Sequence, residues 1–243
     1  MTAFLIALQF LTSLPVRLRE MPTPEETGRS MLFYPLVGLI LGLLLWMIAS
    51  FIHPAPVMMT AALVLAAWVA LTGALHLDGL ADTADAWLGG LGDRERTLQI
   101  MKDPRSGPMA VVVLVVVLLL KFVALTTLLS AGAIVAPLLA IVVGRGAVLA
   151  LFLTTPYARP GGLGETMATH LPRSAAGLIL GVTALCVWIV GGAAGFSLLL
   201  VCAVLFWFLR RAFMRRIGGT TGDTAGALLE LTECAVLVWL ALS

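Results

Sequence analysis

Long apolar runs, separated by short polar stretches, follow one another along almost the whole chain. Apolar runs of about 18 residues or more are typical of helices that cross a membrane, because about 20 helical residues span the roughly 30 Å hydrocarbon layer. The glycine-rich residues 191–195 predict a tight turn that divides an otherwise continuous stretch of 35 residues into two spans. The pattern therefore predicts about seven transmembrane helices, at residues 33–52, 57–77, 109–129, 132–154, 175–192, 194–209 and 226–242.

The first apolar stretch, residues 1–14, is too short to be a further span. As a helix it would be about 21 Å long, whereas the hydrocarbon layer is about 30 Å thick. No basic segment precedes it, and Pro15 follows it together with Arg17 and Arg19, so we do not expect a cleaved signal peptide. We expect this stretch to form an interfacial or re-entrant helix.

The composition is that of an integral membrane protein. Hydrophobic residues make up 60% of the chain and charged residues 12%, whereas soluble proteins carry about 25% charged residues. We therefore expect residues 1–243 to form one all-α domain, a polytopic helix bundle in the lipid bilayer. The net charge of +2 is too small to indicate nucleic acid as a partner. Cys186, Cys202 and Cys234 stand singly in apolar runs, so neither disulfides nor thiolate metal sites are expected.

The basic residues indicate how the chain is oriented in the membrane. Thirteen of the fifteen Lys and Arg residues lie before the first span or in the connections 78–108, 155–174 and 210–225, and the other connections carry no charge. The positive-inside rule then predicts a bacterial-type inner membrane protein with a cytoplasmic N-terminus and an external C-terminus. The three polar segments 76–108, 155–174 and 210–225 would meet on the cytoplasmic side and build a single site.

Three acids recur at helical spacing in the polar stretch between the second and third predicted spans. If this stretch continues the helix before it, Asp78, Asp82 and Asp85 lie within roughly 60° of one helix face. No base stands between them, so a bound cation is the simplest counterion, and all-oxygen ligands favour Mg²⁺ or Mn²⁺ over zinc. A frayed helix end with incidental acids is the alternative. His53 and His170 have no liganding neighbours, and we assign them no function.

Two further polar segments offer groups that bind anions. Arg159 and Arg173 flank a glycine-rich bend, where backbone NH groups and guanidinium forks suit phosphate. Four arginines in residues 210–216 precede a GlyGly turn, after which Thr221 or Asp223 is expected to cap the last helix. For the glycine-rich bend, the alternative is a plain connection between helices. For the arginine run, the alternative is an ordinary positive-inside anchor.

Four charged residues lie inside the predicted spans. Glu230 and Glu233 belong to the last span, and Lys121 and Arg145 are the only basic residues within the others. A charge at the centre of the bilayer costs about 2.5 to 3.5 kcal/mol on insertion scales, so these residues need partners or a water-filled cavity. We expect Arg145 to pair with Glu233, either to pack the helices or to line the site.

Five separated motifs carry a resemblance to a known family. They read FYPLVG at 33–38, HLDGLADTADA at 76–86, RTLQIMKDPRSG at 96–107, YARPGGLG at 157–164 and GGTTGDTAGALLELTE at 218–233. In this order they resemble the cobalamin synthase family, adenosylcobinamide-GDP ribazoletransferase. The similarity extends over almost the whole chain.

The resemblance implies a Mg²⁺-dependent membrane enzyme at the final stage of cobalamin nucleotide-loop assembly. It would join adenosylcobinamide-GDP to α-ribazole or its 5′-phosphate and release GMP. Displacement at a diphosphate needs metal to neutralise phosphate oxygens and bases to hold the nucleotide. The expected site comprises the metal ligands Asp78, Asp82, Asp85 and Asp223, the catalytic groups Asp103, Asp223 and Lys102, the substrate- or phosphate-binding groups Arg105, Arg159, Arg145, His76 and Arg216, and Glu230 and Glu233 as supporting residues.

Two other function classes compete with this interpretation. A CDP-alcohol phosphotransferase also uses an Asp-rich motif with an AspGly pair, but its pattern needs an Arg after the alanine, whereas Asp82 follows Ala81 here. A secondary transporter would place its charges at the midplane between repeated halves, whereas most acids here stand at helix ends and no repeat is evident. The number of copies, a homo-oligomer included, stays open.

Overall fold

The structure is a computed structural model that describes residues 2–18, 20–52 and 54–243, so that Arg19 and His53 lie outside the described residues. The regular structure is helical, and the described residues form no strand beyond one isolated bridge. The all-α prediction is therefore confirmed. The helices are α1 (Thr2–Leu11), α2 (Pro24–Ser30), the short 3-10 helix η1 (Met31–Phe33), α3 (Tyr34–Ile52), α4 (Val57–Leu71), α5 (Leu75–Gly89), α6 (Arg94–Ile100), α7 (Pro108–Ser130), α8 (Ala136–Thr154), α9 (Leu163–Thr169), α10 (Arg173–Ile217) and α11 (Gly222–Leu242).

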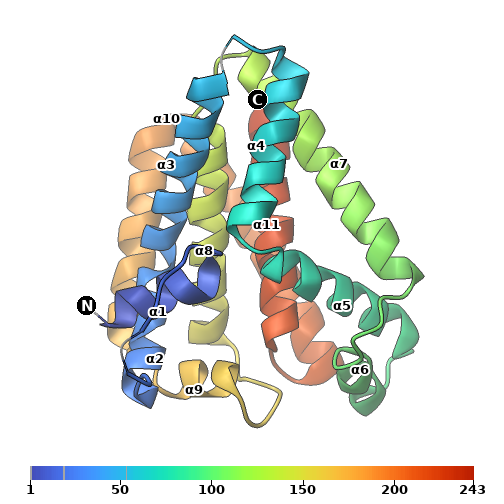
Figure 1. The fold of residues 1–243 in the computed structure, drawn as a ribbon. Helices are drawn as coiled ribbons and strands as arrows, with labels where there is room; N and C mark the ends of the chain where they lie inside the picture. The colour runs from blue at the N-terminus through green and yellow to red at the C-terminus, as the bar shows by residue number, and fades with distance from the viewer. Residues whose placement is uncertain (1, 19, 53) are drawn as a thin grey trace.

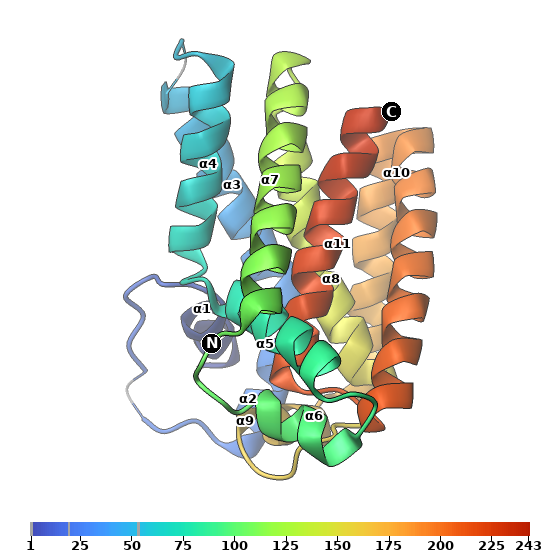
Figure 2. The same ribbon diagram turned by 90° about the vertical axis from the view of Figure 1, so that its right-hand side faces the viewer.

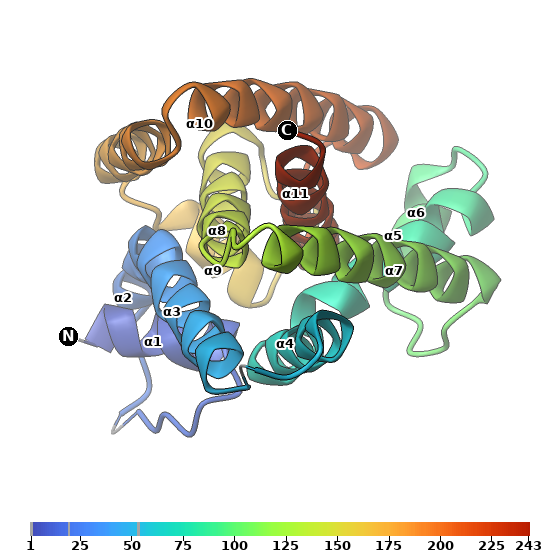
Figure 3. The same cartoon turned by 90° about the horizontal axis from the view of Figure 1, so that it is seen from above.

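The long helices stand side by side as a bundle with α8 and α11 at its centre (Figures 1 and 3). Both central helices bury apolar side chains completely, for example Leu149 of α8 and Leu228 of α11. The outer helices α7 and α10 instead turn large apolar side chains outward, and Val115 and Phe208 are 59% and 66% exposed. A helix that is apolar on all sides is expected where its outer surface contacts hydrocarbon rather than water.

The spans agree in number with the hydrophobic pattern. Among the described residues, five helices are long and apolar enough to cross a membrane, or six if the bent pair α4 and α5 forms one span. Within α10, Gly192 has φ 55° and ψ −133° and breaks the helix, and the backbone of Val187 lies against Gly195. The chain therefore folds back as two antiparallel arms, which Figure 2 shows side by side. Counting the two arms separately gives six spans, or seven if the bent pair is also one, and the turn predicted at 191–195 is confirmed.

The second span ends earlier than predicted. α4 stops at Leu71 and α5 begins at Leu75, with an angle of 86° between them. Gly73 and Ala74 have φ of 59° and 55°, in the left-handed region that an α-helix cannot continue through. The expectation that the acids continue the preceding helix is therefore wrong. They lie instead on α5, a new helix that crosses the lower end of the bundle (Figure 2).

The N-terminal stretch does not cross the bundle. Its helix α1 has ten residues and packs against η1, just before α3, where the Phe4 and Phe33 rings meet edge to face at 5.8 Å between centroids. A helix of that length is about 15 Å long, half the hydrocarbon thickness. The prediction that this segment is not a span agrees with the structure.

The polar segments gather at one end of the bundle. Figures 1 and 2 show α2, α6 and α9 at the lower end, together with the connection between α10 and α11, while the C-terminus lies at the opposite end. The base-rich segments that the sequence assigns to one side of the membrane are thus together in space.

Single-cysteine labelling checks the orientation of this end. In a background without the three native cysteines, we expect Glu95→Cys to react with an impermeant maleimide only from the cytoplasmic side and Ser243→Cys only from outside. Glu95 is exposed in the α6 region and Ser243 is the exposed last residue. The reverse labelling pattern would contradict the orientation.

Candidate active site

The crossing of α5 and α11 depends on two glycines. A Cβ atom at Gly79 would come within 3.1 Å of the Cα atom of Asp223, and one at Gly226 would come within 3.1 Å of the His76 carbonyl oxygen. A Cβ atom at Gly79 would also come within 2.9 Å of the Asp223 carbonyl oxygen, which is too short, and the space at Gly226 is tight, so the two glycines favour this close approach of the helices. The crossing brings the first turn of α5, with Asp78, against the first turn of α11.

The start of α11 is fixed by a capping box. The Thr221 hydroxyl accepts a hydrogen bond from the Thr224 amide at 3.2 Å, and the Thr224 hydroxyl accepts one from the Thr221 amide at 2.8 Å. The helix cap is therefore Thr221, one of the two residues expected. Asp223 follows it inside the helix and remains available for other contacts.

The segment after α8 carries Arg159 to the same place. The Ala158 amide donates to the Thr220 carbonyl at 2.8 Å, and the Thr220 amide donates to the Pro156 carbonyl at 2.9 Å. These two bonds hold residues 156–158 alongside the chain before α11. Arg159 then donates from Nη2 to Oδ2 of Asp223 at 2.9 Å, which joins two segments that were predicted separately.

The acids at this crossing form a cluster of like charges. Burial and the nearby carboxylates of Asp78, Asp223 and Asp85 together raise the pKa of Asp82 to about 6, against the opposing effect of Arg159. Within the described part of the chain, neither Asp78 nor Asp82 pairs with a base. The cluster therefore holds more negative charge than its one arginine neutralises.

Asp85 already has a structural role in this cluster. Its carboxylate accepts hydrogen bonds from the Gly107 amide at 2.5 Å and from the Ala110 amide at 3.0 Å. These amides are free at the start of α7, because the first turn of a helix has no acceptors for them. Asp85 therefore fastens α7 to α5, a contact that its helical spacing with the other acids did not predict.

The donors at the crossing match a hard divalent cation in kind. Asp78, Asp82 and Asp223 present carboxylate oxygens, the ligands that Mg²⁺ prefers. In the described ranges, no three His, Cys, Asp or Glu residues already converge tightly enough to enclose an ion.

The expected groups Lys102, Asp103 and Arg105 lie in the exposed loop between α6 and α7. Arg105 donates to Asp103 through its backbone amide and its guanidinium, with 2.7 Å between Nη2 and Oδ2. These hydrogen bonds lower the pKa of Asp103 to about 2. Among the described residues, no hydrogen bond or ion pair joins this loop pair to the carboxylate cluster.

Arg216 holds two helix ends together instead of standing free for a phosphate. Its guanidinium donates to the Trp87 carbonyl near the end of α5 and lies 5.5 Å from the centroid of the Trp87 ring. Arg210 donates similarly to the Thr154 carbonyl at the end of α8, at 2.6 Å. Carbonyls at helix ends lack partners within the helix, so cations satisfy them well.

The four charges inside the spans form one buried network. Lys121 Nζ lies 2.6 Å from Glu230 Oε2 and 2.7 Å from Glu233 Oε2, and Arg145 pairs with the other oxygen of Glu233. The expected pair of Arg145 and Glu233 is confirmed. Because the Arg145 side chain is 0% exposed, it is enclosed by the helices and cannot reach a phosphate at the surface, contrary to the expectation from the sequence.

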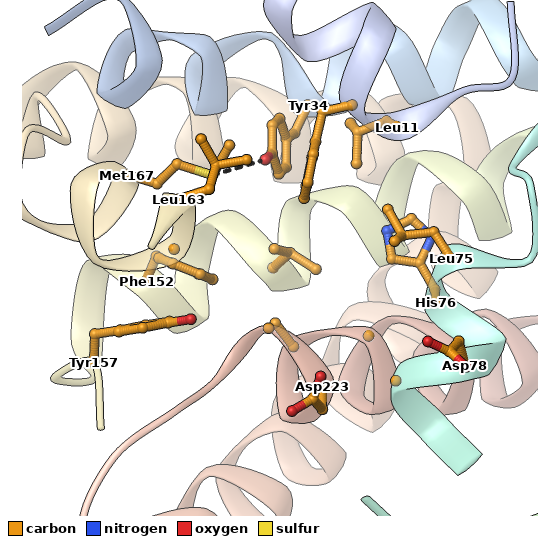
Figure 4. A pocket seen from close by; sticks show the side chains of 17 residues that line it. Leu11, Tyr34, Leu75, His76, Asp78, Phe152, Tyr157, Leu163, Met167 and Asp223 are labelled. Carbon is orange, nitrogen blue, oxygen red and sulfur yellow. Dashed lines mark hydrogen bonds between the residues drawn. The ribbon is translucent and has the colours of Figure 1, made fainter. Parts of the chain in front are cut away.

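A cavity of about 170 Å³ opens beside the carboxylates, as Figure 4 shows. It is lined by side chains from α1, α3, α5, α8, α9 and α11 and from the segment before α9, with Asp78 and Asp223 at one edge and His76 between α5 and the cavity. Its other walls are aromatic or apolar: Phe10, Leu11, Tyr34, Leu75, Val148, Phe152, Tyr157, Leu163 and Met167.

The aromatic residues that line the cavity were not predicted to have a role in the site. In a membrane protein an aromatic side chain has the same hydropathy whether it faces lipid, the core or a ligand, so the pattern alone does not single it out. The available signal was their place in motifs, since Tyr34 lies in FYPLVG and Tyr157 begins YARPGGLG.

Comparisons with known proteins agree over the full length of the chain. The family model for cobalamin-5-phosphate synthase matches residues 3–241. A relative from Pseudomonas fluorescens is 62% identical over 242 residues, covering 100% of both chains. One from Pseudomonas entomophila is 63% identical over 242 residues, covering 100% of this chain and 99% of its own. One from Stutzerimonas stutzeri is 62% identical over 243 residues, covering 100% of this chain and 98% of its own.

All three relatives carry the name adenosylcobinamide-GDP ribazoletransferase. No solved structure matches the chain. The family model spans residues 3–241, and the relatives are similar from end to end. The chain therefore belongs to the cobalamin-5-phosphate synthase family.

Proposed function

We propose that the protein is an adenosylcobinamide-GDP ribazoletransferase that joins this activated corrinoid to α-ribazole, or its 5′-phosphate, and releases GMP. The names of relatives that match the chain from end to end support this activity. The structural observation that carries it is the cluster of Asp78, Asp82 and Asp223 beside Arg159, at the edge of a cavity. Phosphoryl transfer requires carboxylates and a base close together, and little else from a protein.

The reaction is a displacement at phosphorus. A ribose hydroxyl oxygen of the ribazole forms a bond to the phosphorus atom attached to the corrinoid side chain. The bond between that phosphorus atom and the bridging oxygen of the diphosphate breaks, so that GMP departs with the bridging oxygen. The hydroxyl proton passes to a carboxylate.

Three carboxylates would hold a Mg²⁺ ion, or Mn²⁺ in its place: Asp78, Asp82 and Asp223. When bound, the ion neutralises the phosphate oxygens on which charge develops. Arg159 stands beside Asp223 and would hold the diphosphate or the departing GMP, since its fork fits phosphate with two hydrogen bonds.

The proton acceptor belongs to the same cluster. Asp103 is a poor candidate, because the Arg105 hydrogen bonds keep its pKa at about 2 and a carboxylate with so low a pKa accepts a proton weakly. Asp223 is better placed, since it stands at the cavity edge and is partly buried. We assign it as the group that accepts the proton or shares the metal.

The activity itself is checked with purified protein in lipid nanodiscs. We expect GMP release from adenosylcobinamide-GDP only when α-ribazole or its phosphate is present, and loss of release when EDTA removes divalent cations. Restoring Mg²⁺ should restore the rate. Release of GMP without ribazole, or turnover of a CDP-alcohol by the same preparation, would count against the proposal.

Asp82→Asn tests the metal ligands. An amide keeps the size of the side chain but lacks the charge that holds a divalent cation, so we expect kcat to fall by about 10²- to 10³-fold at normal membrane yield. Asp93→Asn is the matched control. Asp93 caps α6 by accepting the Arg96 amide at 2.7 Å, and asparagine caps equally well. Wild-type turnover by Asp82→Asn at saturating Mg²⁺ would remove Asp82 from the ligand set.

Asp223→Asn and Asp223→Ser test whether α11 takes part in the chemistry. Thr221 already caps this helix, so we expect both variants to keep their thermal stability while activity falls at least about 100-fold and the Mg²⁺ dependence shifts. A purely structural role gives the opposite result, a loss of about 1 kcal/mol of stability with most activity retained. That second pattern would confine the site to residues of α5.

A further inference from the structure

We infer that the cavity beside the carboxylate cluster is the site for the flat aromatic base of ribazole, with His76 as the residue that recognises its ring nitrogen. This inference rests on the proposed function, because it assigns one part of the ribazole substrate to one part of the site. Three features support this assignment: the size of the cavity, the chemistry of its walls and the unpaired ring of His76.

The size of the cavity limits what enters it. Its volume is about 170 Å³, and an apolar cavity of about 150 Å³ holds a molecule of benzene. A flat aromatic group of that order fits, whereas a corrin macrocycle or a whole guanosine diphosphate does not. The corrin macrocycle therefore approaches the carboxylates from outside the cavity.

The walls of the cavity suit an apolar ring. Tyr34 stacks with Phe10 at 6.5 Å between ring centroids, and Phe152 lies 5.9 Å from Tyr157. Figure 4 shows Tyr34 and Tyr157 on different sides of the space. Aromatic rings pack favourably against such walls in stacked or tilted arrangements. Guanine would bury several edge donors and acceptors here, where few polar groups face them, and that burial is unfavourable.

His76 supplies the polar contact that a benzimidazole base needs. The residue is 6% exposed, and its Nδ1 atom has no hydrogen-bond partner within the described residues. Buried ring nitrogens are normally paired, and His76 lines the cavity, so its unpaired ring is a polar group available to a ligand. A neutral imidazole donates from one ring nitrogen or the other according to its tautomer, so the nitrogen on the cavity side can carry the proton. The base of ribazole offers one acceptor, the ring nitrogen that is not bonded to the sugar.

The position of the carboxylates then orients the sugar. Asp78 and Asp223 stand at one edge of the cavity (Figure 4), so a base inside it leaves the ribose at that edge. The reacting hydroxyl would lie beside the carboxylates and Arg159, which pairs with Asp223. Binding of the base thus positions the nucleophile before the corrinoid substrate arrives, as effective displacement requires.

Equilibrium binding tests the assignment without turnover. We would titrate wild-type protein in nanodiscs with α-ribazole and with the matching indole riboside, in which a C–H group replaces the free ring nitrogen. We expect the indole compound to bind about tenfold more weakly, since it leaves the buried His76 donor unpaired. Equal affinity for the two compounds, or no binding of α-ribazole, would overturn the inference.

Variants at His76 assign the preference to this residue. His76→Phe keeps an aromatic ring but has no donor, so it should bind both compounds equally, while His76→Gln should retain part of the preference. His170→Phe is the control, because His170 lies at the end of α9 and does not line the cavity. A His76→Phe protein that still prefers α-ribazole would exclude His76 as the recognition group.

Steady-state kinetics separate this inference from the proposed function. In His76→Phe we expect KM for α-ribazole to rise about tenfold, with KM for adenosylcobinamide-GDP unchanged. GMP release with no preference between the two ribosides would leave the proposed function standing and refute the cavity assignment. Selective binding of α-ribazole without GMP release would support the cavity assignment and refute the proposed function. A rise in KM for the corrinoid alone would assign the cavity to the other substrate.

Discussion

Charges buried among apolar helices have to meet opposite charges, and this constraint fixes how the bundle is assembled. Lys121 of α7 and Arg145 of α8 both bind Glu233 of α11, and Lys121 also binds Glu230. Each of the four residues is at most 4% exposed. Removing one partner from such a network leaves an uncompensated charge, at a cost of about 3 to 5 kcal/mol. The network therefore favours the register in which these three helices meet. Gly144 of α8 makes room for the Glu233 side chain.

The register of α11 in turn determines where the site lies. Asp223 precedes Glu230 by seven residues, which is about two turns or 10.5 Å along the helix. Once the network holds Glu230, Asp223 is fixed at the polar end of the bundle. There α5 crosses α11 at Gly79 and Gly226, and this crossing adds the other carboxylates. The buried charges thus support the site from behind without lining its cavity.

The site has two adjacent parts with different physical character. Carboxylates and Arg159 form the charged part, which suits the phosphate chemistry of the proposed reaction. Aromatic side chains form the apolar part, which is enclosed by helices from most of the chain (Figure 4). An apolar pocket with a few polar groups at defined positions is the usual form of a small-molecule site. In a membrane bundle such a pocket needs only that some apolar side chains face inward rather than toward lipid.

The sequence by itself determined the features that depend on local pattern. These are the all-helical membrane fold, the hairpin at Gly192, the common side of the basic segments, the pair of Arg145 with Glu233 and the family. Hydropathy and unpaired charge are properties of short segments, so no packing information was needed. The tertiary structure decided the break at Gly73 and Ala74, where the alanine as well as the glycine has a positive φ. It also decided the use of Asp85 to cap α7 and the enclosure of the aromatic cavity. These features arise where distant segments meet, and an apolar or acidic residue looks the same in sequence whichever surface it meets.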